Sequence, residues 1–399
     1  MSSEFLSGLL DFVIRHKFVV AFYVAMAVLV FIHRKKFQFQ LKFIAICRTK
    51  LGLGLMDRIA SRYREIVKLF GYIGIGAGFL SMLFIVLILV QSVFTLLTVP
   101  GSPSPISPVI PGVRIPGVPD GFFVPFVQGI IAIFIIAVVH EFAHGVVARA
   151  HDIRVKSSGP AIIGPIFAAF VEPDDAQLKK KDDVVNYSLF AAGTFSNILL
   201  TLVIMLLLSV VFAPISSAFF REEGVVLKSV DPGAPAGVAG LGQGMQVKSI
   251  DGQPVGSMRD ALNALYFTRA NQTVVFSDGK TEYAVVAGFN EKFRPRGYFG
   301  IVMEPVLRNG ASIFFSIFSW LQGLLALTAT LSLGIGLANM IPVGPLDGGK
   351  MVHLALQRIR GEQKANKTFI RLSLLLLIVI LFLLSPIFKA ILKSVAAIF

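Results

Sequence analysis

Three ionisable side chains lie close together in an otherwise apolar stretch, IIAVVHEFAHGVVARAH. His140 and His144 are four residues apart, so a helix would place both imidazoles on one face, where they can share a metal ion. Glu141 follows the first histidine, close enough to reach water beside that metal. A pair of neutral histidines packed between helices is the simpler interpretation, but it leaves Glu141 unexplained, because an uncompensated charge in hydrocarbon is costly. The pattern predicts a metal site with a carboxylate base.

A third ligand should accompany the histidines, because catalytic zinc usually has three protein ligands and one open position. The stretch ANMIPVGPLDGGKMVHLAL offers two polar candidates, Asp347 and His353. Asp347 follows a run broken by proline and glycine, where the backbone can bend toward a site, and His353 lies in the helix expected to resume. The chemistry favours Asp347, although its carboxylate would also suit the N-cap of that helix.

Two asparagines also fall in apolar surroundings. Asn197 lies in AAGTFSNILLTL, and Asn339 lies just before the broken stretch. A buried amide needs partners, so each asparagine either joins two helices or donates to a substrate carbonyl. Joining helices is the commoner role for a single asparagine in a membrane helix.

Composition indicates that the segments carrying these residues are membrane helices. The chain has 399 residues, of which 55% are hydrophobic and only 15% charged. Apolar runs near or above about 20 residues can cross a bilayer. The fold class is therefore a polytopic α-helical membrane protein with about six transmembrane segments, the first of which is short. We expect these segments at about 18–32, 70–99, 122–150, 187–216, 311–341 and 369–395.

The net charge of +14 indicates sidedness rather than nucleic-acid binding, because the basic residues cluster beside the apolar runs. Examples are HRKKFQFQLKF and QRIRGEQKANK. A basic loop from Arg34 to Lys68 is expected in the cytosol, which places the His-Glu cluster toward the cytosolic side. Cys47 is the only cysteine, so an intrachain disulfide is excluded.

The regions between the spans differ in composition. Residues 100–121 are rich in proline and predict an extended extracytosolic loop. The apolar run at 159–171 is too short to span, and we favour a re-entrant hairpin over a surface loop. Residues 221–305 alternate short strands and helices with turns, which predicts a small extracytosolic α/β domain. The domains expected are 1–99 (N-terminal membrane segments with the basic loop), 100–121, 122–216 (first part of the catalytic core), 221–305 and 306–399 (second part).

Three blocks of the chain resemble the site-2 protease family of intramembrane zinc metalloproteases. They are HEFAH at 140–144, GTFSN at 193–197 and NMIPVGPLDGG at 339–349, the last of which matches Asn-x-x-Pro-x-x-x-x-Asp-Gly at every defined position. The resemblance covers about residues 122–355, and Thr194 departs from it because many relatives have proline there. It implies Zn²⁺ on His140, His144 and Asp347, a general base at Glu141, and roles for Asn197 and Asn339 in holding substrate or the transition state.

The domain at 221–305 resembles PDZ domains through APAGVAGLGQGMQVKSIDGQPV, although Gln-Gly-Met replaces the Pro-Gly-Asp of many relatives. PDZ domains bind extended peptides by strand addition.

The resemblance to site-2 proteases implies an intramembrane zinc metalloprotease that hydrolyses peptide bonds in or near transmembrane segments of membrane proteins, as in regulated intramembrane proteolysis. Its partners would be such substrates, a peptide or protein segment at the PDZ-like domain, and membrane lipid, with no nucleic acid.

Two other functions fit part of the pattern. A metal-ion transporter could also have broken helices and histidines at membrane depth, but no inverted repeat is visible and Glu141 would be surplus. An inactive scaffold could recruit partners through the PDZ-like domain, but the candidate ligands and base are all present.

Overall fold

A computed structural model of the whole chain describes residues 14, 17–34, 37–40, 44–99, 102, 104–116, 118, 123–163, 166–219, 222–289, 297–307 and 313–396. Its contacts form two compact units. The first comprises residues 1–206 and 323–399, and the second comprises residues 207–322.

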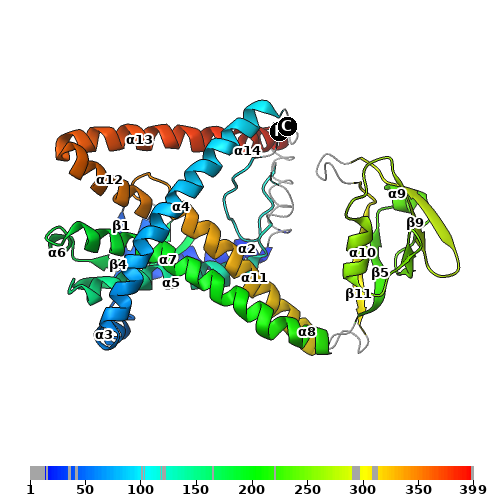
Figure 1. Cartoon of the computed structure of the whole chain (residues 1–399), viewed down its shortest axis with the longest axis horizontal. Coiled ribbons are helices and arrows are strands. Elements are labelled where there is room, and N and C mark those ends of the chain that lie inside the picture. Colours follow the sequence, from blue (N-terminus) through cyan, green and yellow to red (C-terminus); the bar gives the residue numbers. More distant parts are fainter. Residues whose placement is uncertain are drawn as a thin grey trace. The chain divides into compact units, whose positions relative to one another are not determined.

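Five helices are long and apolar enough to cross a membrane, and each corresponds to a segment predicted from the sequence (Figure 1). The run Asp183–Ala218 is continuous through α7 (Asp183–Leu207), the π-helical turn η2 (Leu208–Phe212) and the start of α8 (Ala213–Phe219). These helices make the protein an integral membrane protein. The other four are α4 (Arg64–Thr98), α5 (Phe126–Ala150), α11 (Ile313–Asn339) and α13 (Glu362–Leu383).

The first predicted segment is present as a short helix that is not confirmed as a span, and the last is shorter than expected. The first forms α2 (Lys17–Ile32), whose 16 residues extend about 24 Å, short of a hydrocarbon core of about 30 Å. The predicted total of about six transmembrane segments is therefore not confirmed. The last segment ends its span at Leu383, and α14 (Ser385–Ala396) begins after one residue. Pro386 explains this break, because proline lacks the N–H that would continue the α13 ladder.

A four-stranded antiparallel sheet of order β1-β2-β3-β4 belongs to the first unit. The apolar hairpin predicted at 159–171 is present in it, as β3 and β4. The loop predicted between the first two segments is not plain loop, because it contains β1, β2 and α3 (Leu53–Arg62). The strands are β1 (Phe37–Gln40), β2 (Ile44–Cys47), β3 (Val155–Ile163) and β4 (Ile166–Pro173).

Helix α3 fixes the end of α5 that carries the histidines. Its apolar face buries Met56 and Ala60, and its polar face places Asp57 2.9 Å from Arg149 Nε on α5. Gly145 makes this approach close, because an added Cβ there would contact the Met56 sulfur. The same cluster contains residues of α4, α5 and α7, so these helices share one core (Val67, Val146, Val147, Ala148, Ala150, Leu189 and Ala192).

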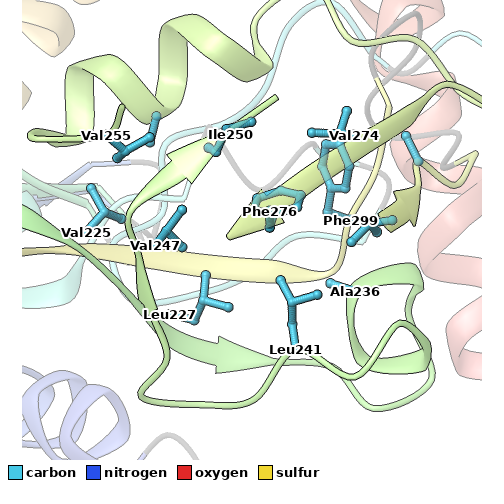
Figure 2. Packing of buried hydrophobic residues seen from close by; sticks show 13 residues of the cluster. Val225, Leu227, Ala236, Leu241, Val247, Ile250, Val255, Val274, Phe276 and Phe299 are labelled. Carbon is cyan, nitrogen blue, oxygen red and sulfur yellow. The ribbon is translucent and has the colours of Figure 1, made fainter. Parts of the chain in front are cut away.

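The second unit contains a small domain with two antiparallel sheets, of order β10-β9-β7-β8 and β11-β5-β6. Their inner faces enclose a core in which Leu227, Ile250 and Phe276 are fully buried (Figure 2). Ser257 and Asp260 form a capping box that begins α10. The predicted sheet domain is present. Its elements are β5 (Glu222–Val230), α9 (Pro235–Val238), β6 (Gln246–Val247), β7 (Ser249–Ile250), β8 (Gln253–Pro254), α10 (Met258–Leu265), β9 (Thr273–Ser277), β10 (Glu282–Val286) and β11 (Ile301–Leu307).

Two short helices and the proline-rich segment complete the first unit. Helix α6 (Asp175–Leu178) follows β4, and α12 (Asp347–Arg360) packs against α13. Among residues 100–121, positions 102, 104–116 and 118 are described and contain no helix or strand. Ser104 attaches this segment to the bundle, since its hydroxyl donates to the Leu383 carbonyl at 2.8 Å.

Candidate metal centre

Helix α5 carries both histidines on one face, as the spacing predicted. The Nε2 atoms of His140 and His144 lie 3.3 Å apart, and both side chains are buried. Their rings meet edge to face, with centroids 4.9 Å apart. The two ring nitrogens therefore point toward a common position.

Asp347 reaches the same position from the start of α12. Its Oδ2 lies 3.2 Å from Nε2 of His140 and 3.2 Å from Nε2 of His144. The chain folds back tightly here, because a Cβ at Gly348 would strike the Met340 backbone and one at Gly349 would strike Val343. The two glycines thus allow α12 to begin against the end of α11, which brings Asp347 to the histidines.

The three donor atoms fit a zinc ion. Their separations of 3.2, 3.2 and 3.3 Å match the edge of a tetrahedron with zinc–ligand bonds of about 2.0 Å, which is about 3.3 Å. A Cβ added at Gly193 would contact Nε2 of both histidines, so the glycine keeps this position open. Two imidazoles and one carboxylate with a free coordination position are a typical catalytic zinc set.

The other candidate ligand points elsewhere. His353 Nε2 lies 2.6 Å from Oδ1 of Asn366, and its ring packs against Phe369. The remaining oxygen of Asp347, Oδ1, accepts from Lys350 Nζ at 2.9 Å. The structure therefore brings Asp347 to the histidines and leaves His353 in the contact between α12 and α13.

Glu141 lies between the histidines and the sheet. Its Oε2 accepts the Val171 N–H at 3.0 Å, so the edge strand β4 holds the carboxylate. Together with His144 and Asp347 it lines a cavity of about 860 Å³. The lining is rich in charged groups, which suits entry of water; among them are Asp175, Lys179, Lys181, Asp183, Lys350 and Arg358.

The two asparagines occupy different environments. Asn197 is fully buried in α7, and its Nδ2 lies 3.3 Å from Nδ1 of His140. Asn339 is the last residue of α11 and is half-buried. Asn197 thus lies behind a candidate ligand, on the ring edge opposite Nε2.

Some contacts of the site could not be predicted from residue types. His144 Nδ1 lies 2.7 Å from the backbone oxygen of Leu189, and a backbone carbonyl leaves no signal in the sequence. Thr194, which departs from the proline of many relatives, donates its hydroxyl to the Gly336 carbonyl at 3.1 Å and so joins α7 to α11. In the sequence, the only sign of this contact is that threonine replaces the proline of the family pattern at position 194.

Comparisons with known proteins agree with the geometry of the site. The chain is 27% identical over 307 residues to an uncharacterized protein of Methanocaldococcus jannaschii, a match covering 76% of this chain and 75% of that protein. It is 25% identical over 260 residues to the zinc metalloprotease RasP of Bacillus licheniformis, covering 53% of this chain and 61% of RasP. A putative zinc metalloprotease of Brucella suis is 44% identical over 62 residues, which are 15% of this chain and 16% of the relative.

The relatives' names and the donor set support Zn²⁺ as the cofactor. Residues 128–384, well over half of the chain, match the sequence model of peptidase family M50. The chain therefore belongs to peptidase family M50, the site-2 protease family that its three motifs resemble.

Proposed function

We propose that this protein is an intramembrane zinc metalloprotease that hydrolyses peptide bonds in or near transmembrane segments of other membrane proteins. The observation that carries the proposal is the convergence of His140 Nε2, His144 Nε2 and Asp347 Oδ2 within 3.3 Å of one another. Glu141 lines a cavity together with His144 and Asp347, and a carboxylate oxygen of Glu141 lies within 4.8 Å of a ring nitrogen of each histidine. The helices around the site are membrane helices, so the reaction takes place at membrane depth.

The assigned residues divide the chemistry between them. His140, His144 and Asp347 would hold the zinc ion, which when bound acts as a Lewis acid toward water and the scissile carbonyl. Glu141 takes the proton from the attacking water and passes it to the leaving amine. Its carboxylate accepts only one described N–H, that of Val171, so its second oxygen is available for this transfer. Asn339 is proposed to help hold the substrate.

A transmembrane helix hides each peptide bond behind its own hydrogen bonds, so the substrate must unwind locally. The edge strand β4 is suited to bind the unwound segment, because among the strands that the structure describes it pairs with β3 alone. Its Val171 N–H contacts Glu141, which brings the strand next to the base. Strand addition along β4 would carry the scissile bond past Glu141.

The sidedness of the protein follows from charge. The basic residues near α3 and between α12 and α13 are placed in the cytosol, together with the site. The domain at 221–305 then lies outside the cytosol. We assign it a PDZ-like role, in which a peptide would add to the edge of β11, because β11 ends its sheet and α10 packs against β11 and β5.

The test is proteolysis of tagged model transmembrane helices by the purified protein in lipid nanodiscs. Wild type should cut a helix with a central Asn-Gly pair, which unwinds easily, faster than a polyleucine helix. Glu141→Gln should lose at least about 100-fold in cleavage, the range of general base catalysis, while keeping one zinc per chain. Undiminished cleavage by Glu141→Gln would remove the general-base role, and wild type without zinc would defeat the proposal.

A further inference from the structure

Helix α7 presents three residues of one face to the two histidines. Leu189, Gly193 and Asn197 follow at intervals of four, so they form one stripe along the helix. Leu189 and Asn197 contact one histidine each, and Gly193 leaves the space between them. The stripe therefore determines how both imidazoles are oriented.

The contact of His144 shows what the stripe does. Its Nδ1 lies 2.7 Å from the Leu189 carbonyl, which can only accept. Nδ1 therefore carries the proton, and the lone pair of Nε2 points toward His140 and Asp347. A backbone acceptor thus selects the tautomer that can bind a metal through Nε2.

His140 needs the same arrangement, and Asn197 is the group that can supply it. If Nε2 of His140 donates its lone pair to a metal, Nδ1 carries the proton and requires an acceptor. Asn197 is the side chain at Nδ1, at 3.3 Å, and its Oδ1 has no other partner among the described residues. The two ends of an amide differ only through hydrogen bonding, so a half-turn of the amide places Oδ1 against the ring N–H.

We propose that Asn197 is a positioning residue, which accepts the Nδ1–H of His140 and thereby fixes the tautomer and ring orientation of a zinc ligand. This inference rests on the proposed zinc site and differs from the role implied by the family resemblance, in which Asn197 holds the substrate or transition state. Asn197 is 0% exposed and lies at Nδ1 of His140, whereas Nε2 of that ring faces the other two donor atoms. A substrate carbonyl in the cavity would not meet this amide.

The surroundings of Asn197 hold it in place for this task. Its backbone oxygen accepts the hydroxyl of Thr201 at 3.0 Å and that of Ser332 on α11 at 2.9 Å. Gly336 packs so closely that an added Cβ would lie 3.1 Å from the Asn197 Cβ. The amide is thus clamped between α7 and α11 with its end at the His140 ring.

The experiment measures zinc affinity by competition with a chromophoric chelator, for wild type, Asn197→Ala and Asn197→Asp in nanodiscs. Asn197→Ala should weaken zinc binding about 10- to 100-fold, as loss of a ligand's outer hydrogen bond usually does. Asn197→Asp should bind zinc within a few-fold of wild type and keep cleaving a model transmembrane helix, because a carboxylate accepts the same N–H. Thr328→Val, the control, removes a buried hydroxyl that donates to the Leu324 carbonyl within α11, away from Asn197, and should leave zinc affinity unchanged.

The alternatives give different results. If Asn197 donates to the substrate, both variants bind zinc like wild type, and Asn197→Asp loses cleavage. Asn197→Leu separates packing from hydrogen bonding, because leucine fills a similar volume but accepts no hydrogen bond. If Asn197 acts only through packing, Asn197→Leu binds zinc like wild type, whereas the inference predicts that it weakens zinc binding as Asn197→Ala does. Either result would overturn the inference and leave the protease proposal intact, whereas wild type without zinc would defeat both. Should Asn197→Ala fail to fold, Asn197→Asp alone separates the two roles, since a carboxylate can accept from His140 but has no N–H for a substrate.

Discussion

At the residue scale, Gly193 shows how an absent side chain defines the site. A Cβ at this position would contact Nε2 of both His140 and His144, where the donor atoms converge. Gly193→Ala should therefore lower zinc affinity by at least about 10-fold, because the methyl group displaces a ring from its ligating position. The zinc content of the purified protein, determined by elemental analysis, measures this loss directly.

A matched control separates this effect from the general effect of alanine in a membrane helix. Gly76 lies in α4 with nothing within 4 Å of an added Cβ. Gly76→Ala should retain full zinc content and should not lower the thermal stability, since alanine is the better helix former. Normal zinc content in Gly193→Ala would show that the imidazole rings can move aside, and that zinc binding does not require a residue without a side chain at position 193.

Part of this site could be predicted from residue types and spacing in the sequence, without knowledge of the fold. The histidines are four residues apart, and Asp347 follows a stretch in which proline and glycine interrupt the helix, so each of the three could be predicted from local sequence. The contacts that orient them could not be named. The Leu189 carbonyl is backbone, and Asn197 opposite His140 depends on how α7 packs against α5.

At the scale of elements, β4 is the strand on which the substrate hypothesis depends. The Val171 N–H points away from β3 and toward Glu141, and directions alternate along a strand, so the Ala169 N–H also points to the free edge. Proline at 169 removes that donor without breaking the ladder to β3, since edge positions tolerate it. Ala169→Pro should reduce cleavage of a model transmembrane helix at least about 10-fold while zinc content stays normal.

Ala169→Val is the matched control, because valine keeps the N–H and favours strands. It should cleave at a rate close to that of wild type. Equal cleavage by the proline and valine variants would show that the substrate does not pair with β4 at this position.

The sheet also carries a pH-sensitive contact. Arg48, directly after β2, donates from Nε to Glu172 on β4 at 2.8 Å, and Ser157 on β3 donates to the same carboxylate at 2.6 Å. The Arg48 guanidinium, and then the Ser157 hydroxyl, hold the pKa of Glu172 below its ordinary value. A lowered folded-state pKa stabilises the fold above the ordinary glutamate pKa of about 4.3 and loses this effect as the pH falls through the lowered value.

Glu172→Gln should therefore lower the melting temperature at pH 7, by an amount that corresponds to at most about 1 kcal/mol for such a partly exposed pair. The difference from wild type should shrink as the pH falls below about 4. Differential scanning fluorimetry at several pH values measures both effects. A difference independent of pH would mean that the glutamine disturbs packing rather than charge.

The sheet also shows where prediction from the sequence stopped at this scale. The hairpin of β3 and β4 is local and apolar, and it was predicted. The strands β1 and β2 lie in the basic stretch, and β2 pairs with β3 more than a hundred residues later, as in Ile44 with Ile163. The short alternation FQFQ gives no sign of such a distant partner.

At the scale of the whole molecule, the membrane spans could be predicted from the sequence, because a span requires only an apolar run long enough to cross the bilayer. That criterion located α4, α5, α7, α11 and α13, whereas the described part of α2, with 16 residues, does not confirm a sixth span. The side of the membrane that each loop occupies is a proposal based on the distribution of basic residues, and it has its own test.

The single cysteine makes that measurement simple. In a Cys47→Ser background, one cysteine can be placed at Lys180, Lys280 or Lys367, all of them exposed. One spanning helix, Asp183–Ala218, lies between the first two positions, and one, Ile313–Asn339, lies between the last two. If each of these helices crosses the bilayer once, Lys180 and Lys367 share a side and Lys280 lies on the other.

In intact right-side-out vesicles, a membrane-impermeant maleimide should label Lys280→Cys and should label the other two variants only after permeabilisation. Labelling of all three from one side would mean that these two helices do not both cross the membrane. The reverse pattern would place the domain at 221–305 in the cytosol and the zinc site toward the outside. The basic residues argue against that orientation, because translocating such clusters across the bilayer is disfavoured.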